Sequence, residues 1–246
     1  MECAAFDAIR QDTPAPGLVV YQPKRGYHYS MEPFVLAGWL LEAGVKGPFL
    51  DVGTGCGILA MLLAYAGLRG EGIDVRPEWM ELANRSLLES RKPNGDTLAL
   101  TFRHQDVRAR TPGERPFGIA VCNPPYFPAD SGPVGPDPVR AFARHEMAGT
   151  LFEIVSSMAR LAKSVAIVLP VVRAEQAHLA FADAGLPVGR QCILAEGLVM
   201  IHGWEGATRF QTESISLRAD GGHSARVCQW YASLGAPLAG RRQRNI

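Results

Sequence analysis

The residues best suited to chemistry in this chain are four in a row, Asn123, Pro124, Pro125 and Tyr126. They follow the apolar run 117–122, which is typical of a buried strand. The strand has to end at the prolines, because proline has no backbone N–H to donate to a neighbouring strand and its φ angle is fixed. The Asn123 amide and the Pro124 carbonyl can then act as fixed acceptors beside the flat ring of Tyr126. Such a set suits a planar substrate that carries an NH2 group. The alternative is an ordinary Asn-Pro turn, which is common at strand ends.

A glycine-rich loop upstream favours the chemical interpretation. Residues 49–60 run from a short apolar strand, through Asp51 and then Gly53, Gly55 and Gly57, into an apolar helix pattern, which is the context of a nucleotide-type cofactor site. The spacing is Gly-x-Gly-x-Gly, which differs from the dinucleotide fingerprint. A carboxylate at Asp51 would repel a pyrophosphate and attract an ammonium group. S-adenosylmethionine (SAM) carries an ammonium group and no phosphate, so the charge favours SAM over NAD.

Two further acids stand at the ends of the next predicted strands. Asp74 lies at the end of the predicted strand 70–75, where an acid hydrogen-bonds ribose hydroxyls in doubly wound folds. Asp106 follows the predicted strand 98–103, where an acid can accept a hydrogen bond from an adenine amino group. The alternative for both is helix capping, for which Asp is favoured. Three acids at three successive strand ends favour a cofactor site.

These motifs resemble those of class I SAM-dependent methyltransferases that act on exocyclic nitrogens. The segment Tyr-Gln-Pro-Lys-Arg-Gly-Tyr-His-Tyr-Ser at 21–30, together with Ala-Arg-His-Glu at 143–146, is similar to the tRNA(Val) adenine-N6 methyltransferase family. The likeness covers roughly residues 18–230. The chain departs from the family pattern at Glu32, where Asp is usual, and in the shortened segments 162–164 and 195–197. These departures bear on the RNA target and leave the cofactor motifs intact.

The resemblance implies a fold, a cofactor and a set of site residues. We expect an α/β fold with a doubly wound, Rossmann-like sheet, helices on both faces and an antiparallel last strand. SAM would be bound by Asp51, Gly53, Thr54, Gly55, Gly57, Asp74, Val75, Asp106, Val107 and Asn123. The catalytic residues would be Asn123, Pro124 and Tyr126, and the substrate would lie against Lys24, Arg25, Tyr27, Pro125, Tyr126 and Phe127. The cysteines and histidines are scattered, so no metal site is expected.

The composition is compatible with one large core, at 246 residues and 47% hydrophobic. We expect a flexible N-terminus at 1–17, a single methyltransferase domain at 18–236 and a basic tail at 237–246. The net charge of +1 means that RNA binding would depend on local patches, such as Lys24 with Arg25. No secretory signal or apolar run of membrane-spanning length is found in the sequence, so we expect a soluble, cytoplasmic protein without a membrane partner.

The remaining segments alternate between helix and strand patterns. The Pro/Gly-rich stretch 128–138 is either a plain connection or a loop that contacts substrate. Thr150 and Glu153 match a capping box that opens a helix. A buried strand is predicted at 165–169, a helix end at Gly185, and strands at 187–194, 198–204 and 210–217.

Four functions are compatible with these residues. The first is adenine-N6 methylation of tRNA, and the second is protein-glutamine N5 methylation, because a glutamine amide also presents a planar NH2. The third is guanine-N2 methylation of rRNA. The fourth is a SAM-binding module without catalysis, which the intact Asn123–Tyr126 turn disfavours. The segment 21–30 favours the first function over the second.

Overall fold

The computed structural model describes residues 6, 8–25, 28–111, 116–124 and 149–236. Several positions of interest therefore lie outside the described residues, namely Tyr27, Pro125, Tyr126, Phe127, the loop 128–138, the segment 143–146 and the tail 237–246. In the described part, no helix is both long enough and apolar enough to cross a bilayer.

A central sheet of eight strands carries the fold, in the order β10-β8-β9-β7-β6-β3-β4-β5. The strands are β3 (Phe49–Val52), β4 (Gly70–Asp74), β5 (Leu100–His104), β6 (Ile119–Cys122), β7 (Ser164–Pro170), β8 (Val188–Leu194), β9 (Leu198–Trp204) and β10 (Gln211–Ile215). All neighbours pair in parallel except β9, which runs antiparallel to both β7 and β8. The doubly wound class is confirmed. The antiparallel strand is present, but it is β9, and β10 follows it along the chain.

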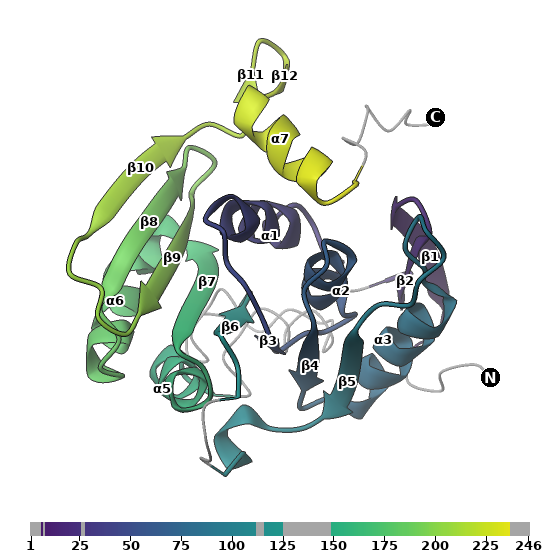
Figure 1. Cartoon of the computed structure of the whole chain (residues 1–246), viewed down its shortest axis with the longest axis horizontal. Helices are drawn as coiled ribbons and strands as arrows, with labels where there is room; N and C mark the ends of the chain where they lie inside the picture. Colours follow the sequence, from purple (N-terminus) through teal and green to yellow (C-terminus); the bar gives the residue numbers. More distant parts are fainter. Residues whose placement is uncertain (1–5, 7, 26–27, 112–115, 125–148, 237–246) are drawn as a thin grey trace.

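Helices cover both faces of this sheet (Figure 1). One face carries α1 (Glu32–Glu42), α2 (Ile58–Tyr65) and α3 (Pro77–Glu89), and the other carries α5 (Leu151–Leu161) and α6 (Ala174–Asp183). Successive side chains of a strand point to opposite faces of the sheet. Phe49 therefore belongs to the hydrophobic core on the side of α1, α2 and α3, and Leu50 to the core on the side of α5 and α6. Because both faces are covered at the centre of the sheet, β6 and most of β7 are apolar and buried, whereas the edge strands β5 and β10 carry exposed polar residues. Helix α7 (Ala225–Ser233) packs on α1.

The N-terminal segment corrects one expected boundary. Residues Ile9–Ala15 form β1, which pairs antiparallel with β2 (Leu18–Pro23), so the predicted division at residue 17 falls inside a hairpin. The hairpin packs on α3, where the Ser86 hydroxyl accepts a hydrogen bond from the backbone N–H of Tyr21 at 2.8 Å. The polar, proline-containing sequence of β1 gave no strand signal by itself. Strand β1 is ordered because it pairs with β2 and because the hairpin packs on α3.

Local signals placed most other elements well. The capping box is confirmed, with the Glu153 N–H donating to Thr150 Oγ1 at 3.3 Å and the Thr150 N–H donating to the Glu153 carboxylate at 2.8 Å. The predicted strand 98–103 lies two residues later, as β5. The predicted strand 117–122 is shorter, as β6, with an isolated bridge between Phe117 and Ala162 beside it. The short pair β11 (Arg218–Ala219) and β12 (Gly222–His223) follows β10.

Candidate active site

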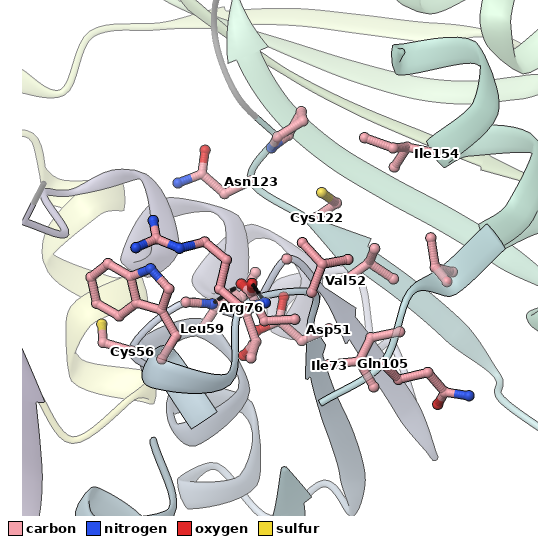
Figure 2. Close-up of a pocket in the computed structure, with 18 of the residues that line it drawn as sticks. Asp51, Val52, Cys56, Leu59, Ile73, Arg76, Gln105, Cys122, Asn123 and Ile154 are labelled. Atoms are coloured by element: carbon pink, nitrogen blue, oxygen red, sulfur yellow. Dashed lines mark hydrogen bonds between the residues drawn. The ribbon is translucent and has the colours of Figure 1, made fainter. Parts of the chain in front are cut away.

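One pocket lies at the carboxyl ends of β3, β4, β5 and β6, where open α/β sheets place their ligands. It is lined by ten of the residues that the sequence predicted for a site: Asp51, Gly53, Thr54, Gly55, Asp74, Val75, Asp106, Val107, Asn123 and Pro124. Figure 2 shows Asp51 below and Asn123 above, with Cys122 next to Asn123. The structure therefore brings the glycine loop, the three acids and the start of the Asn-Pro turn to one place.

The glycine loop depends on conformations that favour glycine. Gly55 has φ of 53° and Gly57 has φ of 85°, both in the left-handed region. A Cβ at Gly57 would also lie 2.5 Å from the ring of Phe102, so a side chain there would displace β5. Gly57 precedes α2 and does not line the pocket, unlike Gly53 and Gly55. Its predicted role is therefore best understood as shaping the loop.

Asp51 is buried, with 1% of its surface exposed, and its carboxylate fixes the loop. The carboxylate accepts hydrogen bonds from Thr54 Oγ1 at 2.6 Å and from the backbone N–H of Ala60 at 3.2 Å. The second bond satisfies a free N–H in the first turn of α2. Burial raises the pKa of Asp51 to about 7, despite those two bonds. The carboxyl group is therefore poised to lose its proton when a cation approaches.

Asp74 joins the loop to the start of α3. Its carboxylate accepts hydrogen bonds from the backbone N–H groups of Gly55 and Arg76, both at 3.0 Å, and burial raises its pKa. A carboxylate has about four acceptor sites, so these two bonds leave capacity for ligand hydroxyls. The position between loop and helix suits the ribose role proposed for this acid.

Asp106 caps the short helix η1 (Val107–Ala109), as the alternative interpretation expected. Its carboxylate accepts from the Arg108 backbone N–H at 2.9 Å and from the Arg108 guanidinium at 2.6 Å. Hydrogen bonds from Arg108 lower the pKa of Asp106, so it is ionised at neutral pH. Asp106 and Arg108 both line the pocket, so capping and ligand contact are compatible here.

Asn123 follows β6 directly, and its side-chain carbonyl oxygen is buried without a hydrogen-bond partner among the described residues. Such an orphaned acceptor costs roughly 1–3 kcal/mol in a folded protein. Pro124, also buried, ends the strand because it supplies no N–H. Asn123 lines the same pocket as the glycine loop, and the cost of its unpaired oxygen is explained if a ligand N–H completes the hydrogen bond.

The pocket also contains residues that the sequence did not single out for a site. They include Gln22 and Tyr29 from the N-terminal segment, Pro33 from α1, Trp79 from α3, and Cys56, Arg76 and Gln105, which follow β3, β4 and β5. The motif at 21–30 contains both Gln22 and Tyr29, and it is the sequence signal from which these two residues could be found. Lys24 and Arg25 are exposed and lie outside the pocket lining.

The donor set fits SAM. Its acids, Asp51, Asp74 and Asp106, match an amine, a ribose and an adenine amino group. The two arginines of the lining, Arg76 and Arg108, donate to the carboxylates of Glu78 and Asp106. The loop glycines Gly53 and Gly55 have open space where a Cβ would stand, so a ligand can approach their backbone closely.

The same fold is found in solved structures of methyltransferases. A predicted O-methyltransferase from Agrobacterium tumefaciens superposes with a TM-score of 0.63 at 14% identity, covering 84% of this chain and 98% of that one. A SAM-dependent methyltransferase from Aquifex aeolicus superposes with a TM-score of 0.51 at 18% identity, covering 70% and 90%. The fold is thus that of class I SAM-dependent methyltransferases.

Sequence comparison identifies closer relatives, although no protein-family model matches the chain. A release factor glutamine methyltransferase from Rhodospirillum rubrum is 36% identical over 112 residues, which are 44% of this chain and 33% of that protein. A tRNA1(Val) (adenine(37)-N6)-methyltransferase from Vibrio parahaemolyticus is 33% identical over 122 residues, so the chain spans about half of that relative, 48%.

Two further enzymes of that name match over longer stretches. The one from Tolumonas auensis is 33% identical over 65% of this chain and 67% of its own length. The one from Bacteroides thetaiotaomicron is 30% identical over 179 residues, 70% of this chain and 72% of its own length. With this identity over most of both proteins, the chain belongs to the tRNA1(Val) (adenine(37)-N6)-methyltransferase family.

Proposed function

We propose that the protein transfers a methyl group from SAM to the N6 nitrogen of an adenine in tRNA. The observation that carries the proposal is the buried, unpaired carbonyl oxygen of Asn123, which shares a pocket with the glycine loop and three acids. The family points to the adenine at position 37 of tRNA1(Val), since its members are named for that base. A tRNA substrate also implies action in the cytoplasm.

Different residues of the pocket would bind different parts of SAM. Asp51 and the backbone of Gly53 to Gly55 would hold the amino-acid end, with the ammonium group near the Asp51 carboxylate. Asp74 would accept from the ribose hydroxyls, and Asp106 from the adenine amino group, with Val75 and Val107 as apolar walls. When bound, SAM supplies an electrophilic methyl group.

The chain's own contribution is to present the amino group of the substrate. Asn123 Oδ1 and the Pro124 carbonyl would accept its two hydrogens, which opposes delocalisation of the nitrogen lone pair and stabilises positive charge as it develops. Holding nucleophile and methyl group in line supplies a large part of the rate. The product nitrogen is strongly acidic while protonated, so no potent base is required.

Recognition of the base is proposed for residues beyond the pocket. An adenine in a tRNA loop has to leave its stack, at a cost of roughly a few kcal/mol. Tyr126 would offset part of this cost by stacking on the base, flanked by Pro125 and Phe127. Lys24 and Arg25, both exposed at the end of β2, would neutralise phosphates, and Tyr27 would contact the same substrate.

A second candidate, glutamine N5 methylation, is favoured by the likeness to the Rhodospirillum enzyme, because a glutamine amide also offers a planar NH2. Guanine-N2 methylation would use the same acceptors. A non-catalytic SAM-binding module does not explain why Asn123 keeps an unpaired acceptor in the pocket.

One assay separates these functions. The protein is incubated with isotope-labelled SAM, total tRNA, rRNA and a release factor, and the products are identified by mass spectrometry of nucleosides and of peptides. We expect labelled N6-methyladenosine in tRNA, formed more slowly by about 100-fold or more with the Asn123→Ala variant. Methylglutamine in the release factor with unmodified tRNA would assign the protein activity instead. Binding of SAM without any labelled product would leave only the binding module.

A further inference from the structure

The N-terminal hairpin supplies part of the wall of the cofactor pocket. Gln22, at the end of β2, is fully buried at 0% exposure and lines the pocket together with Tyr29. Both residues come from a part of the chain outside the central sheet, and Figure 1 shows β1 and β2 beside α3. A fully buried glutamine is uncommon and has to have its polar groups satisfied.

Gln22 is satisfied through both ends of its carboxamide. Its Nε2 donates to the Asp12 carboxylate on the paired strand β1, and its Oε1 accepts from the backbone N–H of Tyr29 at 3.3 Å. Asp12 also accepts from the Arg10 guanidinium at 2.8 Å. The side chain of Gln22 therefore links the hairpin to the segment that carries Tyr29 into the pocket.

Tyr29 lies at the glycine-loop end of the pocket. Burial, and the negative charge of Asp12, raise the pKa of the Tyr29 hydroxyl, so it stays neutral and able to donate. Tyr29 lines the pocket together with Cys56, the residue that follows Gly55 in the loop. The Tyr29 ring also packs against Phe34 of α1, with ring centroids 6.1 Å apart.

The hairpin is in turn fastened to α3. Ser90 Oγ accepts from the Val19 N–H at 2.9 Å, as Ser86 Oγ does from Tyr21, so two serines one helical turn apart replace a strand partner for β2. Upstream, the ring of Phe6 packs on Trp79 of α3 at 5.3 Å, and Trp79 lines the pocket. The position of Gln22 is thus fixed from two sides.

We propose that Gln22 is a positioning residue for the cofactor, holding Asp12 and Tyr29 so that Tyr29 closes the amino-acid end of the SAM site. The inference rests on the proposed function, because it assigns that end of the pocket to SAM. It predicts that disturbing the Gln22–Asp12 pair weakens SAM binding while the chemistry, which belongs to Asn123, continues once SAM is bound.

An exchange of amide and carboxylate tests this role. Gln22→Glu places two carboxylates against each other in a buried site and should raise KM for SAM by about tenfold or more, with kcat within about threefold. Adding Asp12→Asn should restore KM to within about threefold of the wild type, because the introduced amide can donate to the introduced carboxylate while Tyr29 keeps its acceptor. The matched control is Gln11→Glu, which adds the same charge at an exposed position of β1, next to Asp12.

The outcomes separate this inference from the proposed function. SAM binding is measured by calorimetry for every variant, beside circular dichroism to check the fold. If wild-type protein fails to bind SAM, the proposed function is wrong. If it binds SAM, but Gln22→Glu is unchanged or the double variant is not rescued, only the positioning role is wrong. Should Gln22→Glu not fold, Gln22→Met removes both hydrogen bonds without adding charge, and the same rise in KM is expected.

Discussion

The side-chain carbonyl of Asn123 is the single group on which the proposed chemistry depends most. Its oxygen is buried and unpaired, so the site is already arranged before substrate arrives. We expect Asn123→Ala to lower turnover by about 100-fold or more, as loss of one preorganised electrostatic partner does. The affinity for SAM should stay within a few-fold of the wild type, because the oxygen is assigned to the substrate. Single-turnover kinetics and calorimetry measure the two quantities separately.

Asn123→Asp is the matched control for this prediction. It keeps an acceptor of the same size at the same place, so activity should exceed that of Asn123→Ala. An alanine variant with turnover within a few-fold of wild type would show that the carbonyl has another role.

The role proposed for Asp51 predicts that SAM binding is coupled to the release of a proton. Its pKa of about 7 means that it is largely protonated at about pH 6.5, where the α-amino group of SAM, with a pKa of about 7.7–8.0, is also protonated. Placing the ammonium group beside the carboxyl favours the ionised form, so binding should release close to one proton. Calorimetry in two buffers that differ in ionisation enthalpy measures this number. Asp51→Asn should release none, and equal release from both proteins would contradict the assignment.

The raised pKa of Asp51 also affects the pH dependence of stability in the ligand-free protein. Its effect is opposite to that of an acid whose pKa is lowered by a cationic partner. The pKa of folded Asp51 lies above its ordinary value of 3.8, so between these values the folded state holds a proton that the unfolded chain has lost. This contribution to the free energy of unfolding is complete below about pH 4 and is lost as pH rises through about 7. Bound SAM should offset the loss, since its ammonium group compensates the buried charge.

At the scale of the element, α3 is the support of the N-terminal hairpin. Ser86→Ala leaves the buried N–H of Tyr21 without its acceptor and should lower the free energy of unfolding by roughly 1–3 kcal/mol. The control is Ser233→Ala in α7, where the hydroxyl bonds only to its own helix and the change should be near neutral. Urea denaturation gives both values. Hydrogen exchange at the Tyr21 amide should become faster in Ser86→Ala and stay unchanged in Ser233→Ala. Unchanged exchange in Ser86→Ala would contradict the proposal that α3 supports the hairpin.

Elements with local signals were predictable from the sequence, and the hairpin was not. The capping box at Thr150 and the glycines of the loop encode their own conformation, so pattern alone locates α5 and the loop. Residues 9–15 have weak strand propensity, and they are ordered by contacts with β2 and, through it, with α3. The pocket roles of Gln22 and Trp79 were missed for the same reason, because contacts across the fold place these side chains.

At the scale of the whole molecule, the parallel sheet explains how distant residues meet. Because β3, β4, β5 and β6 point the same way, the residues that follow them gather at one edge, although Asp51 and Asn123 are far apart in the chain. This could be foreseen once the strands were identified. The insertion of β9 between β7 and β8 could not, because strand order away from the site leaves no mark on the local sequence.

The near-neutral charge of the molecule means that the proposed tRNA binding has to depend on local charges. With a net charge of +1, the whole surface offers little attraction for tRNA, so the exposed pair Lys24 and Arg25, directly after β2, should carry much of it. Reversing both charges, Lys24→Glu with Arg25→Glu, should weaken tRNA binding and reduce the slope of log K against log salt by about 0.7–0.9 for each lost phosphate contact. SAM affinity should not change, because neither side chain lines the pocket.

The control for charge reversal lies across the molecule. Arg209 and Arg218 are exposed and flank β10, at the opposite edge of the fold from β1 and β2 in Figure 1. Reversing both of them changes the net charge equally, so any general electrostatic effect will appear in both double variants. Filter binding of tRNA over a series of salt concentrations compares the two. Equal losses would mean that overall charge, and not the end of β2, attracts the RNA, whereas a loss confined to the first variant places the tRNA over the hairpin that also completes the cofactor pocket.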